Sequence, residues 1–174
     1  MTAKSKGLAK IWEKMKRPFR QIGQSLFTTQ NCSRYWLEKE IESYAGTLPT
    51  DAMVLDAGSG GCPYKKLFLH CKYESTDFVE TGGNLTYVCD LMNIPVEDNR
   101  YDFILFTQVL EHVPEPEAVL HELYRVLKPG GRILCSAPLF YYEHGAPYDF
   151  YRYTQFGLRH LITKSGFTIE KFDR

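Results

Sequence analysis

From residue 53 onward, short apolar runs alternate with segments of helical periodicity, and this alternation constrains the fold more than any other feature of the sequence. Strands are predicted at 53–55, 73–78, 85–89, 102–106, 132–137 and 167–172. Helices are predicted between them at 64–69, 117–127 and 154–165. Strands that alternate with helices form a parallel sheet with right-handed crossovers. The sequence therefore predicts a doubly wound α/β domain with six strands.

The residues before this domain follow a different pattern. Apolar side chains recur every three or four positions from Leu8 to Leu26, with lysines between them, which predicts a basic amphipathic helix interrupted near Pro18. A second helical pattern runs from Tyr35 to Tyr44. We expect a helical extension over residues 1–49 and one α/β domain over residues 50–174, because 174 residues suit a single core.

The charges are divided between these two parts. The chain has 21 basic and 21 acidic residues, but residues 1–20 hold seven lysines and arginines against one glutamate. An acidic body gives no reason to expect a nucleic-acid partner. The five cysteines form no CxxC pair, and no run is long and apolar enough for a membrane span or a signal peptide. These features predict a cytoplasmic protein with free thiols.

A glycine turn, Gly58-Ser59-Gly60, follows the first predicted strand and leads toward a helix. Such a turn lets the backbone approach a ligand and points N–H groups at it, although a tight turn also needs glycine for structural reasons alone. A dinucleotide fingerprint would place a third glycine at position 63, which is Pro63. Asp56 at the strand end would repel phosphates. The turn therefore favours an electropositive ligand without phosphate.

Acidic residues also end the next two predicted strands. Asp77 follows Gly60 by 17 residues, where an acid in a doubly wound fold meets ribose hydroxyls. Asp90 ends the third strand, where its carboxylate can accept from an adenine amino group while Leu91 and Phe78 flank the ring. Each acid alone is better explained as a loop cap or turn former. Acids at the ends of successive strands indicate a ligand site, because that edge is where such sheets bind ligands.

Five segments together resemble the motifs of class I S-adenosylmethionine-dependent methyltransferases, in order and at normal spacing. They are VLDAGSG, YESTDF, CDLMNIPVEDNRYD, FILFTQVLEHV and ELYRVLKPGGRILCSAP, and the resemblance covers roughly residues 50–174. Within that superfamily, the sequence resembles the bacterial small-molecule methyltransferases known as methyltransferase type 11. The stretch 140–154 is similar to a bacterial subgroup often linked with cell-surface polysaccharide or glycolipid genes.

The resemblance implies a Rossmann-like methyltransferase fold, S-adenosylmethionine as cofactor with S-adenosylhomocysteine as product, and no metal. It implies that the methionine part is lined by Asp56, Gly58, Ser59 and Gly60, that Asp77 binds the ribose, that Asp90, Leu91 and Phe78 meet the adenine, and that Gln108 lies near the sulfonium. One position departs from the family pattern, since the usual third glycine is Cys62 here.

Candidates for the acceptor side follow the fourth and fifth predicted strands. They are Glu111, His112, Tyr141, His144, Tyr148, Asp149 and Arg152. Methyl transfer to a hydroxyl needs orientation and a base, and His112 or His144 can supply the base. His112 is explained as well by a structural hydrogen bond. Asp149 can orient His144 while Arg152 contacts an anion, or Asp149 and Arg152 can pair with each other in a rigid lid.

These observations predict a methyltransferase that acts on a small-molecule acceptor, with an oxygen of a sugar or lipid-linked intermediate as the expected target. The alternative is a non-catalytic S-adenosylmethionine-binding partner or scaffold protein. An NAD-dependent oxidoreductase is disfavoured by Asp56 and Pro63.

Two further expectations concern the ends of the chain. The basic segment 1–26 either covers the cofactor pocket, as N-terminal helices commonly do in this superfamily, or makes a peripheral contact with an anionic membrane. Six strands lack the seventh, antiparallel strand usual in the superfamily, so we expect either a truncated chain or a trimmed sheet edge that favours a homodimer.

Overall fold

The structure, a computed structural model, describes residues 34–80, 82 and 84–173. The chain divides between residues 44 and 45 into two units, and the second unit holds the sheet. A helix over residues 34–47 confirms the second of the two predicted N-terminal helices. The predicted basic helix and its membrane or capping role lie outside the described residues. Within the described part of the chain, no helix combines the length and apolarity that crossing a membrane requires.

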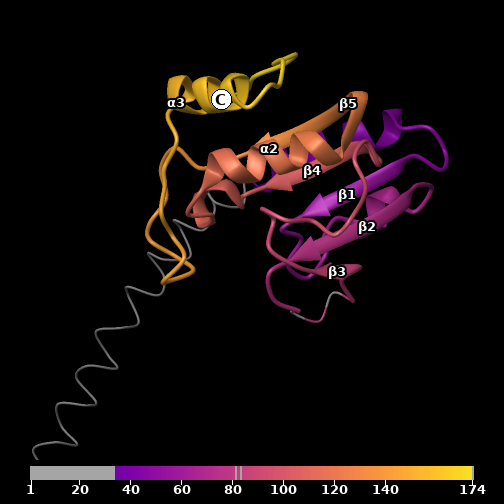
Figure 1. Ribbon diagram of the computed structural model, residues 1–174, viewed down its shortest axis with the longest axis horizontal. Coiled ribbons are helices and arrows are strands. Elements are labelled where there is room, and N and C mark those ends of the chain that lie inside the picture. The colour runs from indigo at the N-terminus through magenta and orange to yellow at the C-terminus, as the bar shows by residue number, and fades with distance from the viewer. Residues whose placement is uncertain (1–33, 81, 83, 174) are drawn as a thin grey trace, which may run out of the picture. The chain divides into compact units, whose positions relative to one another are not determined.

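Five parallel strands form the sheet in the order β3-β2-β1-β4-β5, as Figure 1 shows. They are β1 (Met53–Ala57), β2 (Lys72–Asp77), β3 (Tyr87–Val88), β4 (Tyr101–Thr107) and β5 (Leu127–Ser136). The order reverses between β1 and β4, which makes the carboxyl ends of these strands the topological switch point where open α/β sheets bind ligands. The parallel, doubly wound prediction is confirmed.

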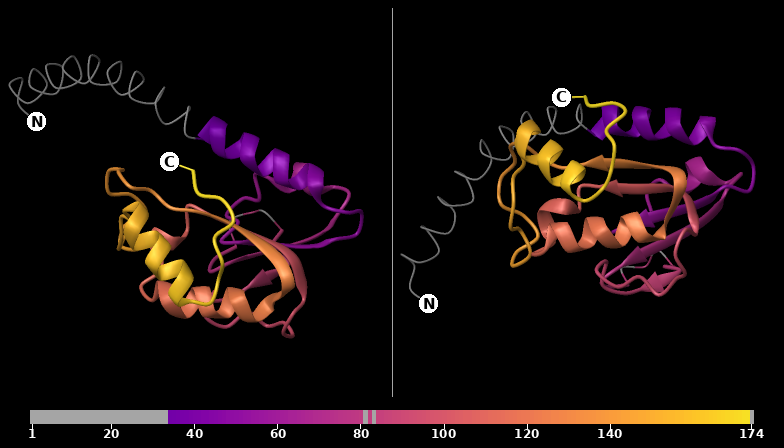
Figure 2. Two further views of the ribbon diagram at one scale, coloured as in Figure 1. Left: turned by 90° about the horizontal axis from the view of Figure 1, so that it is seen from above. Right: turned by 45° about the horizontal axis from the view of Figure 1, so that its top comes forward.

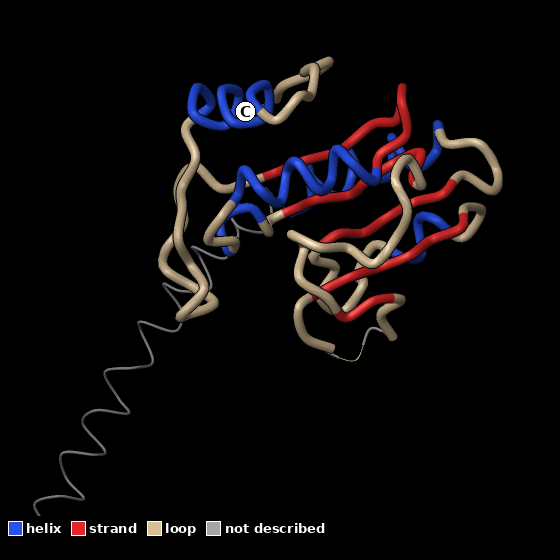
Figure 3. The backbone as a smooth tube through the Cα atoms, viewed as in Figure 1, coloured by secondary structure: helices blue, strands red, loops and turns tan. Residues whose placement is uncertain are grey.

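Helices and short turns connect the strands, as Figure 3 shows in blue and red. They are η1 (Lys65–Phe68), η2 (Leu110–His112), α2 (Pro116–Val126) and α3 (Gln155–Lys164). The segment predicted as a helix at 64–69 is a short 3-10 turn. Helix α2 buries Val119, Leu120 and Leu123 in the core that also holds Ile104 and Phe106 of β4. Side chains alternate between the two faces of a strand, so Phe103 lies on the opposite face of β4, where it stacks on Phe68 of η1.

Helix α3 packs beside α2 on the same face of the sheet, and both views of Figure 2 show the two helices close together. Leu158 of α3 belongs to the same core cluster as the apolar residues of α2. The Lys164 ammonium also lies 2.8 Å from the Glu117 carboxylate. The connection between β5 and α3, residues 137–154, therefore starts at the carboxyl edge of the sheet and returns to its α2 face.

The predicted sixth strand at 167–172 is wrong, because the structure has no strand there and the sheet has five. Phe167 is buried in the core and Phe172 packs against it, so the apolar residues of this segment do face the core as the sequence pattern indicated. The Arg159 guanidinium carbon lies 4.1 Å from the centroid of the Phe172 ring. These side-chain contacts hold the segment without a backbone ladder. In the part of the chain that the structure describes, no strand pairs with the outer edge of β5.

Strand β5 also begins earlier than predicted, directly after α2. Leu127 pairs with Tyr101, whereas Arg132 pairs with Phe103, so residues 128–131 form an irregularity opposite a single residue of β4. That residue is Asp102, whose two carboxylate oxygens each accept a hydrogen bond of 2.8 Å from Lys128. The Lys-Pro-Gly-Gly segment thus ends the helix as predicted and bulges within the strand.

Candidate functional site

The glycine turn starts where β1 ends and is fixed to β2 by its own amides. The N–H groups of Gly58 and Ser59 both donate to the Thr76 carbonyl, at 2.8 and 3.0 Å. Gly58 has φ +72° and Gly60 has φ +52°, the left-handed region that favours glycine. Cys62 also adopts a left-handed φ of +54°, at the position where the family pattern has glycine. The turn therefore keeps its shape despite that substitution.

The two glycines of the turn are required for different reasons. A Cβ on Gly58 would lie 2.5 Å from Cγ2 of Val109, whereas a Cβ on Gly60 would meet nothing within 4 Å. We expect Gly58→Ala to lower the free energy of unfolding by about 2 kcal/mol, from a steric clash added to left-handed strain. The matched Gly60→Ala variant should lose about 1 kcal/mol, from strain alone. Urea unfolding of both variants measures the difference, and equal losses would contradict the close packing of Gly58 on Val109.

Asp77 is held at the carboxyl end of β2 by two backbone amides. Its Oδ2 accepts from the Gly60 N–H at 2.7 Å, and its Oδ1 accepts from the Phe78 N–H at 2.7 Å. Each carboxylate oxygen can accept a further hydrogen bond, and the side chain is only half-buried. Asp77 thus links the turn to β2 and keeps acceptor capacity for a ligand.

Asp56 lies beneath the turn, with 3 % of its surface exposed. The Tyr73 hydroxyl donates to its Oδ2 at 2.5 Å. Burial raises the pKa of Asp56 to about 6, the Tyr73 hydrogen bond opposes this rise, and the nearby Asp77 charge adds to it. A bound cation at this turn would offset the repulsion between the Asp56 and Asp77 carboxylates.

The remaining predicted cofactor residues differ in their surroundings. Asp90 is exposed and its Oδ1 accepts the Met92 N–H at 2.9 Å, so it shapes a turn. Leu91 is buried in the core and supports that turn from beneath, whereas the ring of Phe78 is 65 % exposed. Gln108 has φ +55°, and its side-chain amide donates to the Ser136 hydroxyl at 3.1 Å. Gln108 therefore bridges the carboxyl ends of β4 and β5.

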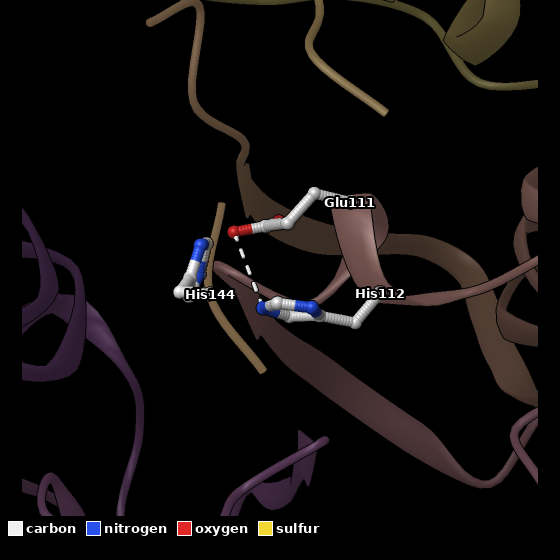
Figure 4. Close-up of side chains that lie close together, drawn as sticks. All are labelled: Glu111, His112 and His144. Carbon is white, nitrogen blue, oxygen red and sulfur yellow. Dashed lines mark ion pairs between the residues drawn. The ribbon is translucent and has the colours of Figure 1, made fainter. Parts of the chain in front are cut away.

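On the acceptor side, the structure brings Glu111, His112 and His144 together, as Figure 4 shows. One potential ligand atom from each lies within 4.8 Å of the other two. Glu111 and His112 come from η2, directly after β4, and His144 comes from the connection 137–154. The two imidazole ring centroids are 4.6 Å apart. Burial raises the pKa of Glu111, while the adjacent histidines and Arg152 oppose that rise.

Asp149 pairs with Arg152, as one of the two sequence interpretations proposed. The Arg152 guanidinium donates to both carboxylate oxygens, at 2.6 and 2.9 Å, and lowers the pKa of Asp149. Asp149 also accepts the backbone N–H of His144 at 2.8 Å. Asp149 therefore positions the backbone that carries His144.

The two predicted tyrosines contribute mainly through their backbone and ring faces. The Tyr141 ring stacks on Tyr142 with centroids 4.4 Å apart, and the Tyr141 carbonyl accepts from Arg152 at 3.2 Å. Tyr148 is 57 % exposed, and its carbonyl lies 2.5 Å from Nδ1 of His112. His112 is thus held by a structural hydrogen bond, while its other ring nitrogen faces Glu111 at 3.8 Å.

The sequence named these residues separately but did not predict the Glu111–His112–His144 cluster. Its formation depends on the folding back of residues 137–154, because the Phe150 N–H donates to the Glu111 carbonyl at 2.8 Å. The adjacent Glu-His pair after β4 is the sequence signal that pointed to one half of the cluster. The Gly58–Val109 contact places the glycine turn directly against the segment that leads into η2.

Comparison with known proteins gives matches that cover the same region. A family described as "Methyltransferase domain" matches residues 55–135. The chain is 38% identical over 72 residues to the ubiquinone/menaquinone biosynthesis C-methyltransferase UbiE of Desulfotalea psychrophila, covering 34% of this chain and 29% of that protein. It is 36% identical over 77 residues to the demethylmenaquinone methyltransferase of Oceanobacillus iheyensis, covering 42% and 32%. The chain thus matches about a third of the length of these curated relatives.

A solved structure extends the similarity to most of the fold. The 1,6-didemethyltoxoflavin-N1-methyltransferase of Burkholderia thailandensis, solved with 1,6-didemethyltoxoflavin and S-adenosylhomocysteine, has a TM-score of 0.63 and 21% identity, covering 80% of this chain and 72% of that one. This likeness shows the fold. The domain match over residues 55–135 and the motifs around the glycine turn are similar to those of the class I S-adenosylmethionine-dependent methyltransferase superfamily, and they support that superfamily for this chain.

Proposed function

We propose that this chain binds S-adenosylmethionine and transfers its methyl group to a small-molecule acceptor. The observation that carries the proposal is the Asp77 carboxylate, which is fixed by the Gly60 amide at the carboxyl end of β2, next to the switch point of the sheet, and retains acceptor capacity. When bound, S-adenosylmethionine supplies a methyl group that its sulfonium has already activated. The name of the Burkholderia thailandensis structure, with S-adenosylhomocysteine bound, supports this cofactor.

The residues around the turn suit a cationic nucleoside better than a dinucleotide. Asp56 and Asp77 add negative charge where a pyrophosphate would need positive charge or free amides. The amides of Gly58, Ser59 and Gly60 already donate within the protein, so they are not available to cradle a phosphate. A carboxylate is instead the natural partner of the ammonium and ribose hydroxyls of S-adenosylmethionine.

Each predicted cofactor residue then has a distinct task. Asp56 faces the ammonium from beneath the turn, and the backbone of residues 58–60 lines the methionine part. Asp77 accepts from the ribose hydroxyls, as its two fixed oxygens allow. The exposed Phe78 ring offers a flat apolar face to the adenine, and Asp90 accepts from the adenine amino group. Gln108, held by Ser136, lies on the side of the sulfonium.

On the acceptor side, His112 and His144 are the candidate bases. The Nδ1 atoms of both rings lie within hydrogen-bonding distance of backbone carbonyls, at 2.5 and 3.2 Å, which leaves Nε2 of each neutral ring able to accept a proton. Asp149 positions His144 through its backbone, and Arg152 holds Asp149. The Tyr141 ring lies beside His144, with centroids 4.9 Å apart, and Tyr148 holds His112 through its carbonyl. We propose an acceptor hydroxyl, as in a sugar or lipid-linked intermediate.

A turnover assay with methyl-labelled S-adenosylmethionine tests this proposal. The acceptor panel contains sugar nucleotides, lipid-linked sugars and, because the curated relatives are named for it, demethylmenaquinone. We expect label in one acceptor class together with an equal amount of S-adenosylhomocysteine. Binding of the cofactor without transfer to any acceptor would instead favour a non-catalytic partner or scaffold protein.

Membrane contact, cytoplasmic localisation and homodimer formation stay predictions. Membrane contact is tested by co-sedimentation of the chain, with and without residues 1–26, with anionic and with neutral liposomes. Loss of anionic binding on deletion is expected if the basic helix lies on the membrane. Unchanged binding would contradict that role.

A further inference from the structure

The carboxylate of Glu111 is fully buried without a hydrogen bond. The residue is 0 % exposed, and neither carboxylate oxygen has a hydrogen-bond partner among the described residues. Its nearest ion-pair neighbour is Nε2 of His112, 3.8 Å from Oε1. Buried carboxylates are normally hydrogen-bonded, paired or coordinated to a metal, because burial without a partner costs several kcal/mol. A buried carboxylate with two unsatisfied oxygens, one of which faces an imidazole nitrogen, therefore requires an explanation.

The two histidines are arranged so that one nitrogen of each remains a ligand. Nδ1 of His112 lies 2.5 Å from the Tyr148 carbonyl, and Nδ1 of His144 lies 3.2 Å from the Tyr142 carbonyl. A carbonyl only accepts, so each Nδ1 carries the proton and Nε2 of the neutral ring has a lone pair. This pattern of one ring nitrogen donating to a backbone carbonyl is the usual support of a metal-binding histidine.

The spacing of the three side chains also suits a shared ion. Figure 4 shows the Glu111 carboxylate and the two imidazole rings directed at a common space. Their ligand atoms lie within 4.8 Å of one another. Bonds of about 2.0–2.2 Å to a tetrahedral ion place ligand atoms about 3.3–3.6 Å apart, so a side-chain movement of roughly 1 Å closes the site. His144 is 30 % exposed and is carried by a connecting segment, which allows that movement.

We propose that Glu111, His112 and His144 form a binding site for one divalent transition metal ion. Two imidazoles and one carboxylate are a donor set that suits Zn²⁺ and its neighbours in the first row, whereas Mg²⁺ prefers oxygen ligands. Three protein ligands leave at least one coordination position open. An oxygen ligand, either water or the hydroxyl of an acceptor, fills that position. With the ion bound, Nε2 of each histidine is a ligand and no longer a base, and the ion instead lowers the pKa of the bound hydroxyl. The last point rests on the proposed methyltransferase function, but metal binding does not.

Titration calorimetry of the full, untagged chain tests the site. The protein is first stripped with EDTA and dialysed, then titrated with Zn²⁺ and, separately, with Mg²⁺. We expect one Zn²⁺ per chain and no comparable heat with Mg²⁺. Substitution of Co²⁺ should give the visible absorption of a metal bound by nitrogen and oxygen ligands, which reports the site without any activity assay.

Substitutions of the proposed ligands test which side chains bind the ion. Glu111→Gln and His144→Gln should each weaken Zn²⁺ binding by at least about 10–100-fold, the loss seen even for outer-sphere partners of metal ligands. The matched control is His121→Gln on α2, whose Nε2 lies 3.9 Å from the Glu117 carboxylate in an exposed pair. This control should bind Zn²⁺ like the unaltered chain. Circular dichroism shows whether each variant is folded, and the partly exposed His144 provides a test that does not disturb the core.

Several outcomes would overturn the inference. They are an unaltered chain that binds no stoichiometric Zn²⁺, a folded His144→Gln variant with unchanged affinity, or an equal loss in His121→Gln, which would indicate surface binding. S-adenosylhomocysteine binding is measured on the same samples. A chain that binds the nucleoside but not Zn²⁺ contradicts the metal site alone, whereas one that binds Zn²⁺ but not the nucleoside contradicts the proposed function alone.

Discussion

Replacing Asp77 by alanine is expected to weaken S-adenosylhomocysteine binding by about 1–3 kcal/mol, or roughly 5- to 150-fold. The carboxylate makes charge-assisted hydrogen bonds, which are stronger than neutral ones. Its loss also frees the Gly60 N–H, which now donates to Oδ2 at 2.7 Å. Calorimetry of the variant and the unaltered chain under identical conditions measures the change.

Two further variants separate the causes of this loss. Asp77→Asn keeps an oxygen for the Gly60 amide but removes the charge, so we expect an affinity between those of the alanine variant and the unaltered chain. Asp98→Ala removes an exposed acid that pairs with Arg125 before β4 begins, at the opposite edge of the sheet. It should leave nucleoside binding unchanged. An Asp77→Ala affinity equal to that of the unaltered chain would show that this acid does not bind the ribose.

Asp56→Asn is expected to have opposite effects on stability and on binding. The pKa of Asp56 is raised from 3.8 to about 6, chiefly by burial. Between these values the folded protein binds more protons than the unfolded chain, so this group lowers stability as the pH rises through that window. The cost is fully present above pH about 6 and amounts to about 3 kcal/mol, from roughly 1.4 kcal/mol per pKa unit.

A neutral asparagine removes that cost and still accepts from the Tyr73 hydroxyl, which bonds Asp56 at 2.5 Å. At pH 7.5 we expect the variant to be more stable than the unaltered chain by about 2–3 kcal/mol, with the gain shrinking toward pH 4. The same variant should bind S-adenosylhomocysteine more weakly, because the ammonium loses its carboxylate. Urea unfolding at both pH values measures stability. A variant that is less stable at pH 7.5 would contradict the buried charge at this position.

The sequence was sufficient for the parts of the fold that are encoded locally. Apolar β1 and β4 and the glycines after β1 determine the parallel sheet and its turn, and Asp77 lies at the predicted strand end. The segment 167–172 misled because its apolar residues, at 167, 169 and 172, can be held by side-chain packing as well as by a backbone ladder. Phe167 is buried by packing, and Phe172 is partly buried against the same core.

The acceptor side could be predicted only in fragments. Asp149 and Arg152 are three residues apart, and the sequence alone allowed them either to pair or to act on a ligand. The structure shows Asp149 paired with Arg152 at 2.6 Å, and the same carboxylate also lies 3.5 Å from Nδ1 of His144. The cluster around Glu111 could not be predicted, because His144 reaches it through the path of a long connection. That path depends on backbone hydrogen bonds such as the one from Phe150 to Glu111.

The central claim is that the turn after β1 and the acid after β2 bind a cationic nucleoside. Calorimetric titration of the full chain with S-adenosylhomocysteine tests it most directly, with NADH as the competing ligand. The predicted result is one S-adenosylhomocysteine bound per chain and no binding of NADH. Absence of S-adenosylhomocysteine binding, or binding of NADH in its place, would contradict both the proposed methyltransferase and the scaffold alternative.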